Sequence, residues 1–343
     1  MQISRRAFLL TVAASACSRR IQRGALQKAT QYLWAQQAED GGFHSATYGL
    51  LRSGQSLTPF VLDALLALPD VTLAPKPAAL ERALAFIKKN TNADGALGVM
   101  DETSADYPNY ATSLAVMVMV KAKRSVSEIT PMVAHLQAQQ FSERNGWKRD
   151  DRVYGAWGMG GPIHRPPATG HVDLSMTRYV LEALRAGGVP PSDPAIAKAL
   201  VYLERSQNKD GGFYFSTVNP EINKAGEANG VYASYGTATA DGLLALRAVG
   251  IPEHDARVQK AIDWLKGHHQ SDRAPGFDGT ARASWGSGLR FYYASVISKA
   301  ALGLPVTLPS QGPDGSFRNE NKMVKEDDPL IATTFAVHVL ARN

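Results

Sequence analysis

The sequence predicts an all-α protein in which about six helix pairs form a closed ring, with one helix of the last pair missing. Three observations predict this fold. A glycine-containing turn recurs along the chain, an amphipathic segment precedes most of these turns, and a more apolar segment follows each of them. No segment shows the convincing two-residue alternation that is typical of a half-buried strand.

The recurring turn combines polar residues, glycine and a following apolar or aromatic residue. Its fourth copy, "NKDGGFYF" at 208–215, is the clearest. Glycine, aspartate and asparagine favour turns because they tolerate backbone conformations that other residues avoid. The turns are centred on Asp40, Asp94, Asn145, Asp210, Gly276 and Asp314. Repetition at intervals of about 50 residues is typical of a repeat architecture.

The segments between the turns alternate in character, which predicts two layers of helices. Segments with apolar residues three and four positions apart on one face are expected to form the outer helices. These are 25–37, 79–90, 129–140, 195–207 and 257–269. Segments that are apolar on more of their surface are expected to be buried inner helices. These are 58–68, 110–120, 173–184, 235–246, 291–302 and 328–340.

The last repeat is shorter than the others. Only "GLPVTLPSQGP" separates Leu302 from Asp314, and its prolines leave no room for a helix of normal length. The sixth outer helix is therefore expected to be missing. Six inner and five outer helices favour a closed ring over an open superhelix.

The charge of the chain argues against a nucleic-acid-binding protein. The net charge is +6, and the lysine and arginine residues are scattered rather than gathered in a basic block. A protein that binds nucleic acid usually presents a basic patch or stripe. We therefore expect a generally solvated surface with no nucleic-acid partner.

Residues 1–17 are expected to form an export signal, followed by a single domain over 22–343. Arg5 and Arg6 precede a short apolar run, which resembles a twin-arginine signal and is too short to span a bilayer. Cys17 is the only cysteine. It is either the lipidated first residue of a lipoprotein or the residue after an ordinary signal-peptidase site. We expect a periplasmic or cell-envelope location, with membrane association if Cys17 is lipidated.

Several stretches of the chain resemble a known family. They are residues 173–215, with "SQNKDGGFYF", residues 235–251, "YGTATADGLLALRAVGI", and residues 291–302 and 313–333. They are similar to bacterial prenyltransferase/squalene oxidase repeat proteins of the terpenoid cyclase and protein prenyltransferase superfamily. The resemblance covers nearly everything after residue 22. It implies an α/α toroid with an apolar central cavity for an isoprenoid-like lipid.

Aromatic side chains are the candidates for contact with such a lipid. Aligning the inner helices on their final leucines brings several aromatic residues to one level of the ring, near the helix N-termini. Aromatic ring faces suit an apolar polyene and would stabilise carbocations in a cyclase. The candidates are Tyr110, Trp157, Tyr232, Tyr235, Phe291, Tyr292 and Tyr293.

Asp173, Asp241 and Asp328 are the candidate catalytic acids, since a cyclase must protonate an alkene. Asp173 and Asp328 also fit helix N-caps, which is the favoured interpretation for both. Asp241 falls inside a buried helix, so its carboxylate is either partnered or faces the cavity. The sequence lacks both the Asp-x-Asp-Asp motif of squalene cyclases and an Asp-Asp-x-x-Asp magnesium motif. No cofactor or metal is expected, because His164 and His171 do not form a recognisable zinc spacing.

Three functions remain open from the sequence. The first is a terpenoid-cyclase-like protein that binds or acts on a polyisoprenoid lipid. The second is a non-catalytic envelope protein that binds a lipid or another protein. The third is a polysaccharide lyase, for which Arg165 and Arg290 are the obvious basic residues.

Overall fold

The computed structural model describes residues 22–68, 77–101, 104–228, 230–279 and 281–342. A first helix over 22–35 precedes the labelled elements. The α-helices that follow are α2 (Leu57–Leu66), α3 (Pro77–Asn90), α4 (Pro108–Lys121), α5 (Val126–Ala138), α6 (Leu174–Ala186), α7 (Pro194–Ser206), α8 (Gly236–Ala248), α9 (Ala256–His268), α10 (Ser284–Gly288), α11 (Arg290–Ala300) and α12 (Pro329–Leu340). The remaining elements are the 3₁₀ turns Leu50–Ser53, Glu143–Asn145 and Pro220–Ile222 and a small hairpin, β1 (Glu227–Ala228) and β2 (Val231–Tyr232).

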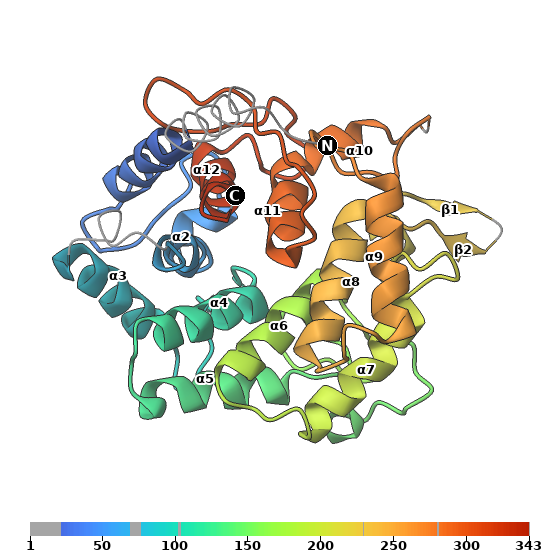
Figure 1. The fold of residues 1–343 in the computed structure, drawn as a ribbon. Coiled ribbons are helices and arrows are strands. Elements are labelled where there is room, and N and C mark those ends of the chain that lie inside the picture. The colour runs from blue at the N-terminus through green and yellow to red at the C-terminus, as the bar shows by residue number, and fades with distance from the viewer. Residues whose placement is uncertain (1–21, 69–76, 102–103, 229, 280, 343) are drawn as a thin grey trace, which may run out of the picture.

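Six helices form the inner ring: α2, α4, α6, α8, α11 and α12. Each packs against the next in this order, and α12 packs against α2 (Figure 1). These helices are buried on most of their surface, which explains why their sequences are apolar nearly all round. The prediction of a closed ring of paired helices is confirmed.

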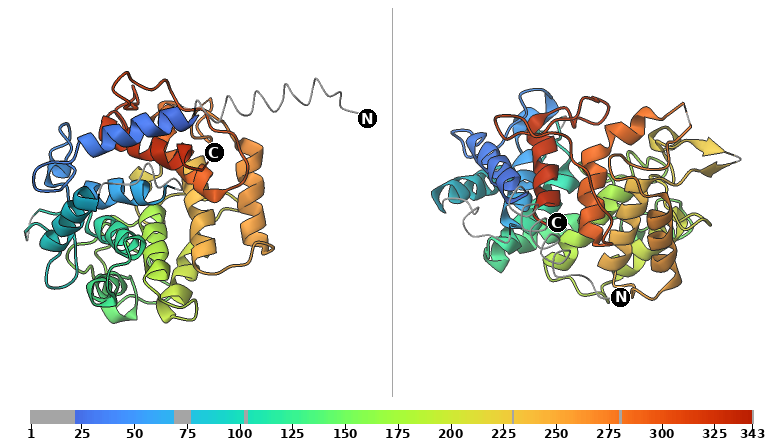
Figure 2. Two further views of the ribbon diagram at one scale, coloured as in Figure 1. Left: turned by 60° about the vertical axis from the view of Figure 1, so that its left-hand side comes forward. Right: turned by 45° about the horizontal axis from the view of Figure 1, so that its top comes forward.

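The outer layer consists of the helix over 22–35 and of α3, α5, α7 and α9, which lie at the periphery in each view (Figure 2). Aspartate N-caps begin two of them: Asp193 accepts from the N–H of Ala195 at 2.8 Å, and Asp255 accepts from that of Arg257 at 2.9 Å. Such caps satisfy backbone donors that a helix leaves free at its start.

The sixth outer helix is missing, as predicted. In the described chain between α11 and α12 no helix forms. An extended segment takes its place, and its residues alternate between half-buried and exposed. The half-buried members are Leu302, Leu304, Val306 and Leu308, which pack against the core. Four aliphatic side chains on one edge of an extended chain thus replace the apolar face of a helix.

Each glycine turn forms a corner between an outer and an inner helix, and a threonine holds most corners in place. The backbone N–H of the buried residue after the turn donates to a threonine Oγ1 on the following inner helix at 2.8–3.1 Å. The pairs are Phe43 with Thr58, Leu97 with Thr112, Trp157 with Thr177, Phe213 with Thr239 and Phe317 with Thr333. A buried donor would otherwise lose its partner on leaving water.

The corner glycines dock on the next outer helix. Numbered along the chain, the six corners carry Gly41, Gly95, Gly155, Gly211, Gly276 and Gly315, all at positive φ. In five of them a Cβ atom would lie 2.0–2.6 Å from a carbonyl oxygen of the next outer helix: that of Arg82, Pro131, Lys198, Lys260 or Lys28. The fifth corner has no such helix ahead of it, and Gly276 instead approaches the Ser234 carbonyl oxygen. Glycine is therefore required for both backbone conformation and close approach.

The third corner differs from the sequence prediction. Its docking glycine is Gly155, ahead of Trp157, rather than the turn at Asn145. Glu143–Asn145 forms a short 3₁₀ turn, and a Cβ on Gly146 would meet only Pro166. The sequence pattern was misleading here because "ERNGW" and "YGAWG" both place a tryptophan close after a glycine.

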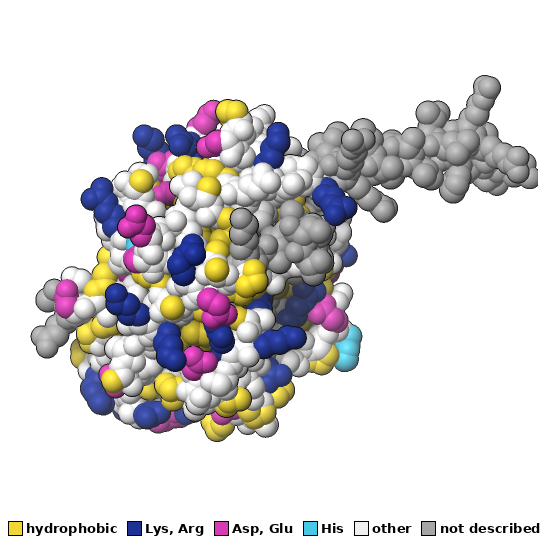
Figure 3. Space-filling view, turned by 90° about the vertical axis from the view of Figure 1, so that its left-hand side faces the viewer, with side chains coloured by type: hydrophobic (Ala, Val, Ile, Leu, Met, Phe, Trp, Pro, Cys, Tyr) yellow, Lys and Arg dark blue, Asp and Glu magenta, His cyan; other side chains and the backbone are white. Residues whose placement is uncertain are grey.

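The ring closes between the two ends of the described chain. Gln311 Nε2 donates to the Ala25 carbonyl at 2.9 Å, and Gln22 Nε2 donates to that of Leu340 at 3.3 Å. On one side of the closed ring, positive and negative side chains are interspersed (Figure 3). Among the described residues, no helix is both long and apolar enough to cross a membrane.

Candidate functional site

A small pocket lies where the N-terminal ends of several inner helices meet. Its volume is about 190 Å³. The lining residues are mostly apolar or aromatic and come from opposite sides of the ring: Leu51, Ser56, Leu57, Phe60, Tyr107, Tyr110, Met176, Val324, Lys325, Ile331 and Phe335. We call this the axial pocket. Its composition matches that of an apolar ligand site with a few polar groups.

Aromatic side chains from five of the inner helices surround the ring axis. Phe60 and Phe335 meet edge to face with their centroids 4.9 Å apart. Tyr110 and Tyr179 do the same at 4.6 Å, and Tyr292 contacts Phe335 at 5.5 Å. These geometries are the favoured ones for aromatic pairs. They pack the pocket residues Phe60, Tyr110 and Phe335 against one another and against Tyr179 and Tyr292.

Two pocket residues have unusual backbone conformations. Tyr107 has φ of 46° and Lys325 has φ of 65°, in the left-handed region that side chains rarely adopt. Lys325 Nζ lies 3.3 Å from Tyr107 Oη and 5.8 Å from the ring centroids of Tyr48 and Tyr107. The pocket therefore combines apolar walls with one ammonium group held among tyrosines.

Charged and titratable side chains from all six inner helices form a second layer, which we call the charged belt: Asp63, Lys121, Arg178, Glu182, Asp241, Lys299 and His338. Lys121 pairs with Asp63 at 2.6 Å. Lys299 on α11 reaches Glu182 on α6 at 2.7 Å, although α8 lies between these helices in the ring. The belt therefore crosses the interior of the ring.

Asp241 is fully buried and partnered, which is one of the two alternatives left open by the sequence. Its Oδ1 accepts from Arg178 Nε at 3.1 Å, and its Oδ2 accepts from Tyr292 Oη at 2.8 Å. Arg178 is 1% exposed and also donates to Glu182 at 2.8 Å. Because one guanidinium serves two carboxylates, Asp241 is only partly compensated.

The protonation behaviour of the belt follows from burial and pairing. Burial raises the pKa of Asp241 to about 6, against the lowering effect of Arg178. Burial also acts to raise the pKa of Glu182, but Arg178 and Lys299 together lower it below its ordinary value. Burial lowers the pKa of His338 to about 3, so this imidazole is neutral at physiological pH. Asp241 is therefore the belt carboxyl that takes up a proton most readily.

Asp173 and Asp328 lie at the starts of inner helices. Asp173 accepts from the N–H of Met176 at 2.8 Å, and Asp328 accepts from that of Leu330 at 2.9 Å. Asp328 also accepts from the Ser45 hydroxyl, and Asp173 from His171 Nε2 at 2.8 Å. Both carboxylates therefore cap helices, the interpretation that the sequence favoured; a catalytic role for them stays a prediction.

Glu326, two residues before Asp328 in the sequence, also caps an inner helix. It is fully buried and accepts from the backbone N–H groups of Phe291 and Tyr292 at 2.9 and 2.8 Å. It thus serves as a cap for α11 from a distant segment. Burial raises its pKa to about 7, against these hydrogen bonds.

The structure separates the predicted aromatic residues into two groups. Tyr110 lines the axial pocket and Tyr292 contacts its wall. The others occupy different places. Trp157 donates to the Leu136 carbonyl at 2.6 Å, Tyr235 packs on Phe277, Phe291 packs on Phe317, Tyr293 meets His269 at 2.9 Å, and Tyr232 packs on Tyr214 in the hairpin region. Contact of any of these residues with a ligand stays a prediction.

The described residues contain no cluster of three or more histidine, cysteine and acidic side chains that could hold a metal ion. His171 contacts Asp173, and His164 stacks on Phe141 with the ring planes 7° apart. Of the two arginines considered for a lyase, Arg290 donates to the Thr307 carbonyl at 3.3 Å and Arg165 is exposed.

Sequence reasoning missed Arg178, Glu182 and Lys299, and also Phe60 and Phe335. A signal was present: Arg178 and Glu182 are charged residues four positions apart inside a segment predicted to be buried. Buried charges are rare unless paired, so such residues on several inner helices should be expected to meet.

Comparison with known proteins agrees with this architecture. The A-macroglobulin TED domain family matches residues 6–219, more than half of the chain. The squalene–hopene cyclase C-terminal domain family matches residues 171–304. The chain belongs to the A-macroglobulin TED domain family. It also belongs to the wider terpenoid cyclase and prenyltransferase α/α-toroid superfamily.

Relatives of this α/α toroid include two bacterial enzymes. The chain is 33% identical over 168 residues to squalene–hopene cyclase of Bradyrhizobium diazoefficiens and 30% identical over 168 residues to the probable squalene–hopene cyclase of Sinorhizobium fredii. In each case the match covers 49% of this chain and 22% of the relative. The α/α toroid thus spans about a fifth of the length of these curated relatives.

Solved structures show the same fold at low sequence identity. One is a variant of the type II terpene cyclase MstE from Scytonema with geranylgeranyl dihydroxybenzoate, at 14% identity and a TM-score of 0.55, covering 94% of this chain and 97% of that one. Another is protein geranylgeranyltransferase-I of Candida albicans with GGPP, at 14% identity and a TM-score of 0.54, covering 91% and 89%. They confirm the α/α-toroid fold of this chain.

Proposed function

We propose that the protein is a terpenoid-cyclase-like toroid that binds the apolar end of an isoprenoid lipid in the axial pocket. The observation that carries this proposal is the pocket itself, an aromatic-walled space at the N-terminal ends of the inner helices. The isoprenoid ligands of the two solved neighbours, geranylgeranyl dihydroxybenzoate and GGPP, support the ligand class.

The size of the pocket limits how much of the ligand it encloses. A dry cavity of about 150 Å³ accommodates one benzene molecule, whereas a drug-sized ligand needs roughly 300–1,000 Å³. A pocket of about 190 Å³ therefore encloses one or two isoprene units. The rest of the chain and its head group would lie outside, where the Lys325 ammonium suits a polar or anionic head.

The test is native mass spectrometry of the purified protein with geranylgeraniol. Ile331→Trp places a large side chain in the pocket and is expected to weaken binding at least tenfold. Val126→Trp is the matched control, because Val126 is 77% exposed on α5 and its substitution should leave binding unchanged. Equal binding by both variants would remove the axial pocket as the site.

Acid-initiated cyclisation or isomerisation is the second candidate. Tyr292 Oη links the Asp241 carboxyl to an aromatic group that packs on the pocket wall. In a concerted relay, neutral Asp241 would pass its proton to the Tyr292 oxygen while the Tyr292 hydroxyl proton moves to an alkene carbon, so that a C–H bond and a carbocation form and the tyrosine stays neutral. The resulting carboxylate would remain paired with Arg178. The faces of Phe60, Tyr110 and Phe335 would stabilise the cation.

Tyr292→Phe distinguishes a catalytic protein from one that only binds the lipid, because this substitution keeps the aromatic ring and removes only the hydroxyl. If the protein is catalytic, this variant retains geranylgeraniol binding and loses turnover. Turnover in the unaltered protein should also increase as the pH falls towards 6, since burial raises the pKa of Asp241 to about 6. A bound lipid recovered unchanged under all these conditions would support the non-catalytic alternative.

We also propose that residues 1–17 direct export, with Cys17 as the lipidation site. These residues lie outside the part of the chain that the structure describes. The proposal rests on Arg5 and Arg6 ahead of a short apolar run. Replacing both arginines by lysine should retain the protein in the cytoplasm, and Cys17→Ala should abolish a lipid mass shift in the mature protein.

A further inference from the structure

The second corner differs from the first, fourth and sixth corners in the hydrogen bonding of its aspartate. In the first, fourth and sixth corners, Asp40, Asp210 and Asp314 accept from the backbone N–H two residues later, at 2.9, 2.9 and 3.0 Å. In the second corner, Asn92 Oδ1 takes this N–H, that of Ala96, at 2.8 Å. The Asp94 side chain therefore does not take part in the hydrogen bonding of the turn. Its carboxylate has neither a hydrogen bond nor an ion pair within the described chain.

A second departure lies on the helix that the corner docks against. Four residues after the docking position, the other outer helices carry an aromatic side chain: Tyr32, Phe86, Tyr202 or Trp264. In the fourth corner, Trp264 Nε1 donates to Asp210 Oδ2 at 3.2 Å. The helix facing the second corner carries His135 at this position, and its buried Nε2 has no hydrogen-bond partner in the described structure.

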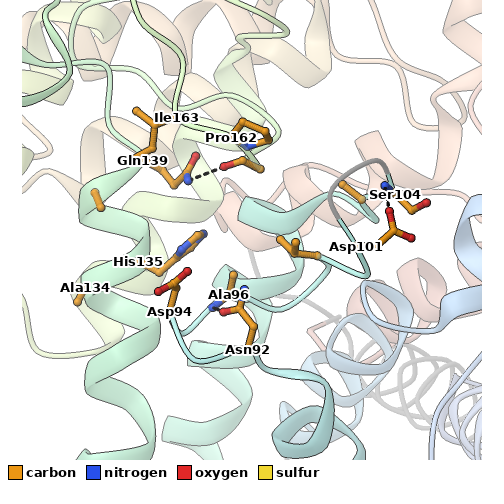
Figure 4. Close-up of a pocket in the computed structure, with 14 residues that line it drawn as sticks. Asn92, Asp94, Ala96, Asp101, Ser104, Ala134, His135, Gln139, Pro162 and Ile163 are labelled. Carbon is orange, nitrogen blue, oxygen red and sulfur yellow. Dashed lines mark hydrogen bonds between the residues drawn. The ribbon is translucent and has the colours of Figure 1, made fainter.

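These two departures coincide with an open cavity of about 690 Å³ (Figure 4). Figure 4 shows the Asp94 carboxylate beside the His135 ring, with Gln139, Pro162 and Ile163 at the other end of the cavity. The lining residues are Asn92, Asp94, Ala96, Val99, Asp101, Ser104, Ala105, Ala134, His135, Ala138, Gln139, Gly161, Pro162 and Ile163. The volume lies in the range of small-molecule sites.

We propose that this second-corner cavity binds a small organic cation that carries N–H donors, such as an alkylammonium. An ionised carboxylate only accepts hydrogen bonds, and the Nε2 of a neutral histidine that carries its proton on Nδ1 accepts one more. An ammonium group supplies three donors and a charge opposite to that of Asp94. Ala134, Ala138 and Ile163 provide apolar surface for the alkyl chain.

The charges around the cavity select against other ligand classes. Among the described lining residues there is neither lysine nor arginine, whereas two of them are aspartates. A carboxylate or phosphate ligand would be repelled by the like charge of Asp94. Among the described residues, the cavity does not bring together three groups that could hold a metal ion. The site is also distinct from the axial pocket, so it does not depend on the isoprenoid proposal.

The test compares three probes of one shape: n-butylammonium, n-butanol and butyrate. Binding is measured by changes in backbone amide NMR shifts of the full protein at neutral pH. We expect n-butylammonium to shift residues 94–97 and 134–139 in a saturable manner. n-Butanol and butyrate should bind at least tenfold more weakly, because they lack the ammonium charge.

Two variants and a control locate the interaction. Asp94→Asn keeps the side-chain shape and should weaken n-butylammonium binding at least tenfold. His135→Phe restores the aromatic residue of the other corners and should also weaken binding. Asp210→Asn makes the same change in the fourth corner and should leave binding unchanged. The proposal is overturned if n-butylammonium does not bind, if n-butanol binds equally well, or if Asp94→Asn and His135→Phe bind as the unaltered protein does.

Discussion

The second and fourth corners have the same backbone but different side-chain chemistry. In both, the N–H of the docking glycine donates to the carbonyl three residues earlier at 3.0 Å, from Gly95 to Asn92 and from Gly211 to Asn208. In both, the N–H of the following apolar residue donates to a threonine. In the fourth corner, Asp210 accepts hydrogen bonds from Ser234 and Trp264. In the second corner, Asp94 has no such partner among the described residues and lines a cavity.

This difference indicates which interactions form the fold and which can diverge. Glycine docking recurs in five corners and connects neighbouring repeats. The threonine hydrogen bond also recurs in five corners and joins each of them to its own inner helix. The aspartate and the facing aromatic residue contribute stability where both are present. In the second corner, where His135 replaces the aromatic residue, the corner keeps its backbone shape and borders a cavity. The following substitutions test this division, from the largest expected effect to the smallest.

Gly211→Ala and Gly95→Ala should both strongly destabilise the protein. Each added Cβ would meet a backbone carbonyl oxygen, at 2.6 Å and 2.3 Å, and each glycine has a positive φ. We expect a loss of about 3–5 kcal/mol in the free energy of unfolding, measured in urea. Gly188→Ala is the control, since Gly188 has a φ of 93° but open space around it, and should cost about 1 kcal/mol. If Gly95→Ala leaves the free energy of unfolding unchanged, the two corner glycines are not equivalent.

Asp210→Ala should destabilise the protein, whereas Asp94→Ala should not. Asp210 accepts from Gly212 N–H and Ser234 Oγ, both at 2.9 Å, and from Trp264 Nε1 at 3.2 Å. We expect Asp210→Ala to lower the free energy of unfolding by about 1–2 kcal/mol. Asp94→Ala should change it by less than about 0.5 kcal/mol. Equal losses would mean that Asp94 has a structural partner after all.

The residue four positions before the docking glycine provides a smaller contrast between the two corners. Gln207 Nε2 donates to the carbonyls of Gly211 at 3.0 Å and Arg257 at 2.8 Å, which ties the corner to α9. In the second corner this position is Thr91, whose hydroxyl donates to Ile87 in its own helix at 2.8 Å. Gln207→Ala should cost about 1 kcal/mol and Thr91→Ala less than about 0.5 kcal/mol in urea unfolding. The reverse order would contradict the assignment of equivalent positions.

The smallest effect should be a pH dependence confined to the second corner. Burial lowers the pKa of His135 below 6.5, against the opposing effect of Asp94. The unfolded chain therefore binds this proton more readily, and His135 reduces stability as the pH falls below 6.5. The unaltered protein and His135→Phe should unfold alike at pH 7.5, and the variant should be the more stable at pH 5. A difference that does not change with pH would show that His135 is not desolvated.

Much of the fold follows from the sequence because repeat positions constrain one another. The apolar inner segments, the glycine turns and the short proline-containing last repeat predict the ring and its missing helix. The third corner was misplaced because a local glycine-tryptophan pattern does not reveal which glycine meets a neighbouring helix. That contact depends on Lys198, more than 40 residues later in the chain.

The candidate site was harder to predict from the sequence because its contacts also join residues that are far apart in the chain. Asp241 was recognised as a buried carboxylate, but its partners come from α6 and α11, 63 and 51 residues away. Alignment by helix length selected Tyr110, which lines the axial pocket, and also Tyr235 and Phe291, which pack elsewhere. Alignment by length gives the level of a residue along a helix but not its direction around the helix axis.

Closure of the ring also affects how the protein folds. Gln22 contacts Leu340 across 318 positions, and Gln311 contacts Ala25 across 286. Contacts of such large sequence separation carry a high loop-closure entropy and slow folding. During synthesis, the helix over 22–35 therefore cannot make these contacts until nearly the whole chain has been made. The nascent ring stays open, with one edge of α2 uncovered, until α12 emerges and completes it.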